Sequence, residues 1–169
     1  MSGEIDDVEV IIILGKTNGG EDMLILCDEK DDGRQISLLI PENTAIAIYS
    51  AMENPKDGSY KDCPCMHHDT INIIELLHGV FDKYVVTSLD DNKFSGFAYI
   101  SQNNNKKSRG TGEIPMIFTR GVILCILLNK PIFVSPHVFS IFRARLDRNP
   151  DIDREKLYKW FSGINLPDR

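Results

Sequence analysis

The sequence has no hydrophobic run long enough to cross a membrane. Its longest apolar stretches, Val8–Leu14 and Gly121–Leu128, are far shorter than the roughly 18–20 residues that a transmembrane helix needs. The stretch Met1–Glu9 is acidic, whereas a secretory signal places basic residues before an apolar segment. We therefore expect no membrane association and a cytoplasmic location.

Cysteine is also scarce. Four cysteines in 169 residues are too few for a disulfide-stapled fold, which favours a reducing compartment. Cys27 and Cys125 lie within apolar segments, where cysteine usually behaves as a small buried side chain. We expect both to be structural.

Positive charge is not in excess, since the formal net charge is −6. Proteins that grip a DNA or RNA backbone usually present a basic surface, because each neutralised phosphate releases counterions. Two local basic clusters exist, and each is typical either of a solvated surface, which we favour, or of a phosphate-binding patch. They comprise Lys106, Lys107 and Arg109, and Arg143, Arg145 and Arg148.

The remaining composition is that of an ordinary globular domain. Hydrophobic residues make up 42% and charged residues 26% of the chain, which is close to the average for folded proteins. A length of 169 residues fits one domain. We therefore predict a single domain over residues 1–169, with a core at about 8–147 and a C-terminal helix at about 152–163.

Hydrophobic periodicity and turn residues predict the order of the elements. Strands are expected at Val8–Leu14, Met23–Leu26, Gln35–Ile40, Lys83–Leu89, Phe94–Ser101, Ile114–Phe118 and Ile132–Ser135, and helices at Thr44–Met52, from Asp69, at Arg120–Leu128 and from Val138. Strands and helices do not alternate regularly. The pattern therefore predicts an α+β fold, with a mixed β-sheet packed against several helices.

Two helix starts carry more specific expectations. Asp69 and Thr119 are residue types that cap helix N-termini, and we predict both as caps. The buried stripe expected behind Asp69 comprises Ile73, Ile74, Leu77 and Phe81. The helix after Thr119 is apolar nearly all round, so we expect it to be central, with Leu124 and Leu127 almost fully buried.

Five segments of the chain follow an order known from one family. They are EKDDGRQISLLIPENTAIAIYSAME at Glu29–Glu53, His68-Asp69 before an amphipathic helix, YVVTSLDDNKFSGFA at Tyr84–Ala98, LCILLNKPIFV at Leu124–Val134, and the closing LYKWFSGINLPD. Together they resemble the bifunctional nuclease (BFN) domain family, with this chain as a divergent member. The resemblance implies a BFN-like domain that hydrolyses phosphodiester bonds in DNA, RNA or both.

Two positions depart from the pattern of that family. Before the buried helix, family members typically read Arg-Pro-Ser-Asp-Ala, whereas this chain reads Ile-Phe-Thr-Arg-Gly at 117–121, so that Arg120 replaces an acid. Thr44 replaces a second acid in the first helix. Acids there would suit a metal-assisted or acid/base phosphodiesterase. The alternative is therefore a catalytically silent BFN-like module for binding or oligomerisation. We expect DNA or RNA as a partner if the protein is active, and a homo-oligomer is the other option.

His68 and Asp69 are the candidate catalytic residues. A histidine beside a carboxylate can activate water or protonate a leaving oxygen, because its pKa lies near neutrality. Helix capping also explains Asp69, and we favour it there, but it gives no reason for the imidazole of His68. The cofactor is left open, and a divalent cation such as Mg²⁺ is one option.

Arg120 is the candidate phosphate-binding residue. A cation in the first turn of a helix is disfavoured by the partial positive charge of the helix start. Arg120 is either an ordinary surface arginine or one with a partner carboxylate such as Glu113, which together we favour, or part of an anion site formed with the N–H groups of the helix start.

The stretch Cys63–Asp69 concentrates potential metal ligands. Cys63, Cys65, His67, His68 and Asp69 fall within seven residues. Structural zinc sites usually have wider cysteine spacing and a second, distant ligand pair, and the BFN resemblance implies no cluster here. We therefore assign no metal ligands and expect the purified protein to carry no stoichiometric zinc.

Overall fold

The computed structural model describes residues 6–31, 34–53, 66–90, 93–102 and 111–148, without side chains from 145 onward. The C-terminal helix predicted at about 152–163 and the basic cluster at 106–109 lie outside these residues. The fold is therefore described for the predicted core.

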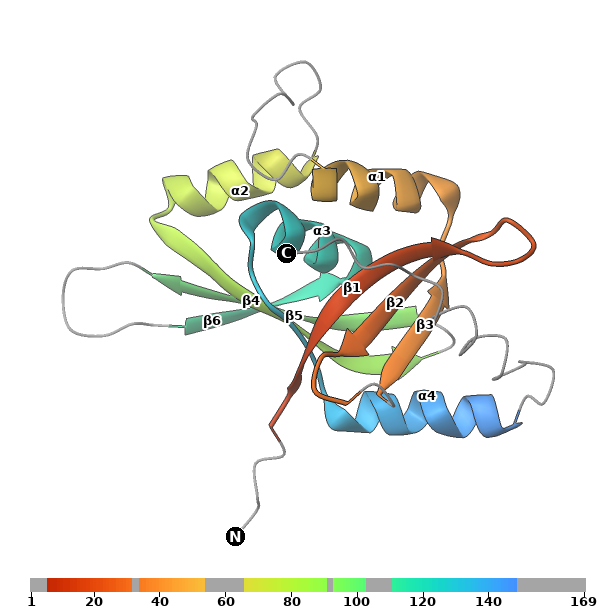
Figure 1. The fold of residues 1–169 in the computed structure, drawn as a ribbon. Coiled ribbons are helices and arrows are strands. Elements are labelled where there is room, and N and C mark those ends of the chain that lie inside the picture. The colour runs from red at the N-terminus through yellow and green to blue at the C-terminus, as the bar shows by residue number, and fades with distance from the viewer. Residues whose placement is uncertain (1–5, 32–33, 54–65, 91–92, 103–110, 149–169) are drawn as a thin grey trace, which may run out of the picture.

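Seven strands form one mixed sheet (Figure 1). They are β1 (Val8–Lys16), β2 (Asp22–Asp28), β3 (Gln35–Leu39), β4 (Gly79–Asp90), β5 (Lys93–Gln102), β6 (Thr111–Ile117) and β7 (Ile132–Val134). Their order across the sheet is β3-β2-β1-β7-β4-β5-β6. Neighbours are antiparallel except β4 and β7, which run parallel. The predicted α+β class with a mixed sheet is confirmed.

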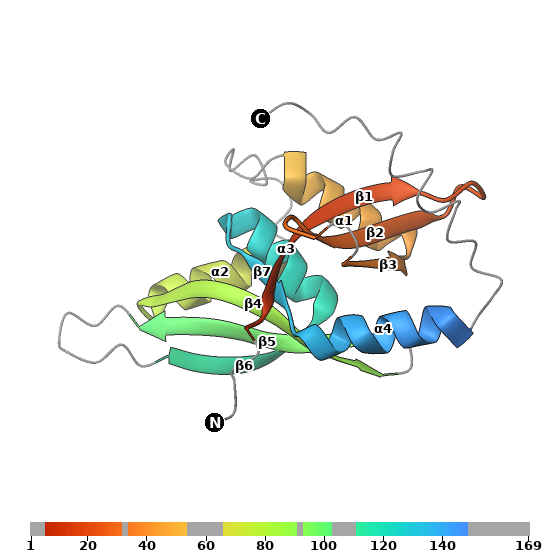
Figure 2. The same ribbon diagram turned by 60° about the horizontal axis from the view of Figure 1, so that its bottom comes forward.

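Four helices pack on this sheet: α1 (Glu42–Glu53), α2 (Met66–Leu76), α3 (Phe118–Leu128) and α4 (Pro136–Arg148). Helix α3 contacts β4, β5 and β6 and also touches α1 and α2, so it lies between the sheet and the other two helices (Figure 1). Helix α4 lies apart from these three and contacts β3 and β4 (Figure 2). The predicted central position of α3 is confirmed, because its residues Gly121–Cys125 are all buried.

Both predicted helix caps are wrong. Helix α2 begins at Met66, so Asp69 is its fourth residue, since no proline or glycine between these positions stops the helix from starting a turn earlier. Helix α3 begins at Phe118, directly after β6, and its N-cap is Ile117, which has an extended backbone and makes no side-chain capping bond. Thr119 is therefore already inside the helix.

The predicted buried stripe of α2 is also corrected. Ile73 and Leu77 are 57% and 66% exposed, while Ile74 packs against the core as predicted, together with Ile71. The helix ends at Leu76, before a turn in which His78 has a φ of 56°. Strand β4 then starts at Gly79, so Phe81, though buried, belongs to the sheet. The apolar residues therefore do not form one continuous helical face.

Helix α3 is buried unevenly along its length. Leu124 is fully buried, as predicted, but Leu127 is only partly buried, which contradicts the expectation of near-complete burial. The buried residues end at Cys125, so the last turn of α3 is only partly covered.

Two irregularities in β4 decide which of its side chains enter the core. The pairing of β4 with β5 shifts register between Phe81 and Lys83 and again between Val86 and Ser88. Each shift inserts one residue and reverses the alternation of faces beyond it. Four side chains separated by three, two and three positions consequently join one hydrophobic core: Phe81, Tyr84, Val86 and Leu89.

Tyr84 is the largest fully buried side chain in the described core. Its hydroxyl donates a hydrogen bond to the carbonyl oxygen of Met116 at 3.0 Å, and burial raises the pKa of this hydroxyl, which keeps it a neutral donor. The ring lies against α3 at Gly121, where a Cβ would be 2.5 Å from its carbons. It also lies beside Gly96 of β5. Two glycines therefore make room for one tyrosine.

We predict that Gly121→Ala destabilises the protein by about 1–3 kcal/mol, because the added methyl overpacks the site and pushes α3 off the Tyr84 ring. In a domain of this size each kcal/mol lowers Tm by about 2–4 °C. Thermal unfolding followed by circular dichroism measures the change. Gly112→Ala is the control, since the nearest atom to its Cβ would be 3.8 Å away. Equal Tm values for the two variants would contradict the Tyr84 contact.

Candidate functional site

The candidate site lies where the starts of α2 and α3 meet. The Arg120 guanidinium Nη2 donates a hydrogen bond to Sδ of Met66 at 2.7 Å. Arg120 is the third residue of α3 and Met66 the first of α2, and 54 positions separate them in the sequence. The two helix N-termini therefore converge on one place.

This convergence makes the site electropositive. The first turn of each helix has N–H groups without helical partners and a partial positive charge, and the N-cap of α3 supplies no side-chain acceptor. The half-buried Arg120 adds a full charge. Within the described part of the chain Arg120 forms no ion pair. The arrangement favours an anion, such as a phosphate, as ligand.

Among the described residues Arg120 forms no ion pair with Glu113, the partner acid that the sequence suggested as one option. Glu113 in β6 is instead opposite Tyr99 of β5. Burial raises the pKa of the Tyr99 hydroxyl, and the charge of Glu113 and a hydrogen bond with its carboxylate raise it further. The acid nearest to Arg120 in sequence is therefore engaged on the neighbouring strand, so Arg120 is either an ordinary surface arginine or part of an anion site.

His67 is the residue of this site that sequence reasoning missed. Burial lowers its pKa most, and the positive charges of Arg120 and then His68 lower it further. The imidazole is therefore neutral at neutral pH and lies within electrostatic range of Arg120. Its position next to His68 in the chain was the available signal, but only the packing of α2 on α3 shows that it is close to a cation.

The two predicted catalytic residues lie in the same first turn. His68 is half-buried and Asp69 is exposed. Asp69 is three residues after Met66, which puts both on the side of α2 that Arg120 reaches. Adjacent residues on a helix point about 100° apart, so His68 and Asp69 leave α2 in different directions.

No metal-binding cluster is found among the described residues, that is, no group of three or more His, Cys, Asp or Glu side chains. Cys63 and Cys65 lie outside the described residues, so the absence of zinc stays a prediction. Of the two remaining histidines, His78 is in the turn after α2 and His137 is exposed at the start of α4. Neither belongs to the converging helix starts.

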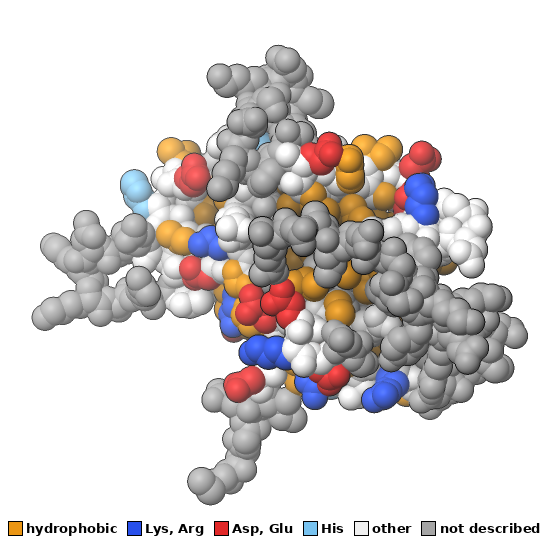
Figure 3. Space-filling view, in the orientation of Figure 1, with side chains coloured by type: hydrophobic (Ala, Val, Ile, Leu, Met, Phe, Trp, Pro, Cys, Tyr) orange, Lys and Arg blue, Asp and Glu red, His pale blue; other side chains and the backbone are white. Residues whose placement is uncertain are grey.

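The basic clusters add little to the described surface. Arg143 is exposed on α4, whereas the side chains of Arg145 and Arg148 are outside the described part. On the face that Figure 3 shows, acidic and basic side chains are interspersed. The positive charge at Arg120 is therefore local. Asp90 of β4 pairs with Lys93 of β5, so the acidic end of β4 belongs to the β4–β5 pairing.

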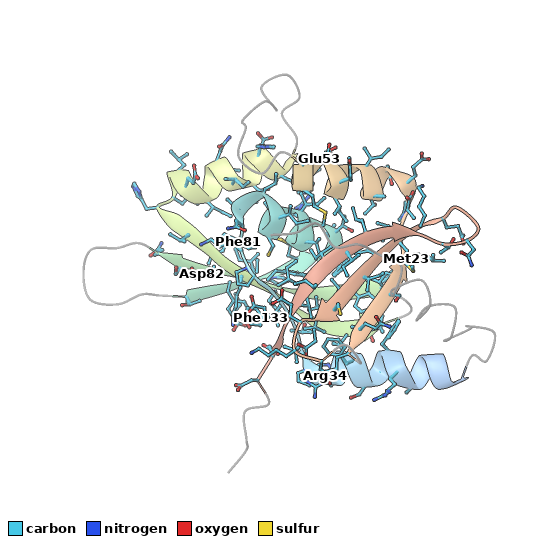
Figure 4. All side chains as sticks on the ribbon, viewed as in Figure 1. Met23, Arg34, Glu53, Phe81, Asp82 and Phe133 are labelled. Carbon is cyan, nitrogen blue, oxygen red and sulfur yellow. The ribbon has the colours of Figure 1, made fainter. Side chains whose placement is uncertain are left out.

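Other polar and reactive groups serve the fold. Asp28 is buried at the end of β2, where it accepts a hydrogen bond from the Lys30 amide at 2.8 Å and lies 3.9 Å from the guanidinium of Arg34 (labelled in Figure 4). Cys125 is buried, and burial raises its thiol pKa to about 12. It is therefore a poor nucleophile and structural, as predicted.

No protein-family model matches the chain, and no curated protein matches it significantly. The BFN resemblance consequently rests on the sequence segments themselves. None of the helices within the described ranges is long and apolar enough to span a membrane.

The lowered pKa of His67 predicts a pH dependence of stability. The unfolded chain protonates this residue near the ordinary value of 6.5, whereas the folded chain protonates it only at lower pH. The contribution of neutral His67 to the free energy of unfolding is therefore complete above pH 6.5. It falls as the pH drops below 6.5, until the folded imidazole also protonates. His67→Gln should remove this part of the slope in denaturant unfolding measured against pH.

A second measurement tests the cause of the shift. In an NMR titration of the imidazole, Arg120→Gln should raise the pKa of His67 toward its ordinary value, because the positive charge of Arg120 is gone while burial remains. Arg143→Gln, which removes an exposed charge on α4, is the control and should leave the titration unchanged. A His67 pKa that is insensitive to Arg120→Gln would contradict the described geometry.

Proposed function

We propose that the protein is a nuclease of BFN type that hydrolyses phosphodiester bonds in DNA or RNA at the converging starts of α2 and α3. The observation that carries this proposal is the half-buried Arg120, which reaches the first residue of α2 and has no carboxylate partner in the described part of the chain. A phosphodiester would supply the missing negative charge.

The site residues divide the chemistry between them. Arg120 and the free N–H groups of the two helices would bind the non-bridging phosphate oxygens and stabilise the charge that grows on them in the transition state. His68 would accept a proton from the attacking water as its oxygen bonds to phosphorus, while the bond to the leaving oxygen breaks and that oxygen takes a proton from solvent. Asp69 is the carboxylate that could hold a divalent cation such as Mg²⁺.

His67 would have a supporting role. Because its imidazole stays neutral, it can donate one hydrogen bond and accept another without adding a second positive charge beside Arg120. A neutral donor next to the guanidinium would orient a phosphate oxygen or the attacking water. The proposed site thus joins one cation, two histidines and one carboxylate.

A catalytically silent binding or oligomerisation module is the second candidate. The net charge of −6 argues against a nucleic-acid substrate, and the replacement of two family acids at Thr44 and Arg120 argues against hydrolysis. The outer side of α2 also favours contact with another chain, since Ile73, Leu76 and Leu77 are 57%, 77% and 66% exposed. This candidate keeps the same phosphate site and drops the proton transfer.

The activity prediction separates the two candidates. Purified protein is incubated with labelled single- and double-stranded DNA and RNA in Mg²⁺, Mn²⁺ or chelator. We expect cleavage, and we expect His68→Ala to lower turnover about 10²–10⁴-fold, the usual contribution of a positioned acid or base. His137→Ala, at an exposed histidine of α4, is the matched control. Asp69→Asn should also lose activity if its carboxylate is chemical.

Three outcomes would decide against parts of the proposal. Absence of cleavage by a folded wild-type protein under every metal condition leaves the silent module. Cleavage at full rate by both His68→Ala and Asp69→Asn would overturn the catalytic assignment and retain the nuclease. An equal loss of activity in His137→Ala would show that histidine removal acts through stability.

The binding prediction concerns Arg120. Arg120→Gln should weaken nucleic-acid binding at low salt and reduce the slope of log K against log salt by about one unit, as expected for one lost phosphate contact. Fluorescence anisotropy with labelled oligonucleotides at several salt concentrations measures both. Lys83→Gln is the control, because Lys83 lies over the Tyr99 and Phe133 rings of the sheet. An unchanged slope in Arg120→Gln would remove Arg120 from the site.

A further inference from the structure

The central strand β1 has an open edge along most of its length. It pairs with β2 from Val10 to Lys16, but with β7 only from Val8 to Val10. Strand β7 is three residues long and is preceded by Pro131, so the chain cannot continue the pairing. Within the described residues no strand covers the β7 side of Ile11–Lys16. Alternate residues of an unpaired strand edge direct their backbone N–H and C=O groups outward.

The burial of β1 agrees with this open edge. Its residues Ile11–Leu14 are all only partly buried, although they belong to the most apolar stretch of the strand. In the neighbouring β2, Leu24, Ile25 and Leu26 are fully buried. A run of four large aliphatic side chains in the middle of a sheet is thus left half-covered, which is typical of a surface that something else completes.

Two clefts lie along this strand. One, of about 340 Å³, is lined by the apolar side chains of Ile12 in β1, Met52 in α1, and Ile126 and Pro131 at the end of α3. The other, also of about 340 Å³, is lined by Leu14 of β1 and Ile46 of α1, and also by the charged Lys16, Asp22 and Glu42. Hydrophobic side chains are visible on the surface between α1 and β1 (Figure 3). The first of the two clefts, which is lined on one side by Ile11 and Ile12 of β1, is here called the β1 groove.

We infer that the β1 groove is the docking site of the chain's own segment 149–169. This segment contains Leu157, Trp160 and Phe161, which are spaced i, i+3 and i+4 and would share one face of a helix. An amphipathic helix that lays such a face in an apolar groove is a common mode of recognition. The lining of the groove is apolar apart from Asn129 and Lys130, so it suits such a face.

The position of α4 makes this docking sterically accessible. Helix α4 ends at Arg148 and contacts β3, which is two strands from β1, or about 10 Å in the direction of the strand pairing. Because α4 and α1 lie on opposite sides of the sheet (Figure 1), the segment also has to pass round the edge of the sheet at β3. The eight residues 149–156 can span up to roughly 26–29 Å. A tethered segment also has an effective concentration in the millimolar range. These facts favour the chain's own segment over a second copy or a strand from another protein. The inference does not depend on the proposed nuclease activity.

Trp160 provides the test, because it is the single tryptophan of the chain. In the folded full-length protein its fluorescence should be shifted to shorter wavelength than in guanidinium, resist quenching by acrylamide and not change with protein concentration. Ile126→Glu and Met52→Glu place a charge in the β1 groove from two walls. Each should shift the emission toward that of the unfolded protein and increase quenching several-fold. Leu76→Glu, at a 77% exposed position of α2, should change neither.

Three results would overturn the inference. A tryptophan in the folded wild-type protein that is quenched as readily as in guanidinium is not docked, and this measurement needs no variant. Emission that stays at short wavelength in both groove variants, with folding verified by circular dichroism, places Trp160 elsewhere. Emission that shifts to longer wavelength on dilution identifies a second copy of the chain as the occupant.

Discussion

The contact of Tyr84 with Gly121 fixes where α3 lies on the sheet. The ring fills the space that a side chain at 121 would need, and the hydroxyl binds the carbonyl of Met116 at the end of β6. Met116 is two residues before α3 and Gly121 is within its first turn, so one side chain holds the helix start from both directions. A fully buried tyrosine must satisfy its hydroxyl, and this bond does so.

The candidate site depends on that constraint. Arg120 precedes Gly121, so the position of the helix start determines where the guanidinium reaches. Because α3 also packs against α2, Arg120 meets Met66, and the neutral His67 lies within range of its charge. The same placement of α3 puts its C-terminal end beside β1, where Ile126 forms a wall of the β1 groove. One packing contact thus orders both ends of the helix.

Much of the fold could be predicted from the sequence. The order of the strands and helices through α4 follows from apolar runs and turn residues, and the central position of α3 follows from its apolar surface. The predictions of the two helix caps failed because Asp69 and Thr119 are also compatible with the first turn of a helix, and the start of a helix depends on neighbouring structure. The side chains of β4 that enter the core could not be predicted, because an alternation with a period of two does not reveal the register shifts beside Asp82 and Thr87.

The sequence by itself determined the α+β class, the buried role of Cys125 and the choice of His68, Asp69 and Arg120 as candidates, since residue type and local pattern carry that information. Only the tertiary structure decided that Arg120 lies at the start of α2, that His67 is near it and that Glu113 is not its partner. These are contacts between segments about fifty residues apart, or between neighbouring strands. They depend on how α3 packs, which no local pattern encodes.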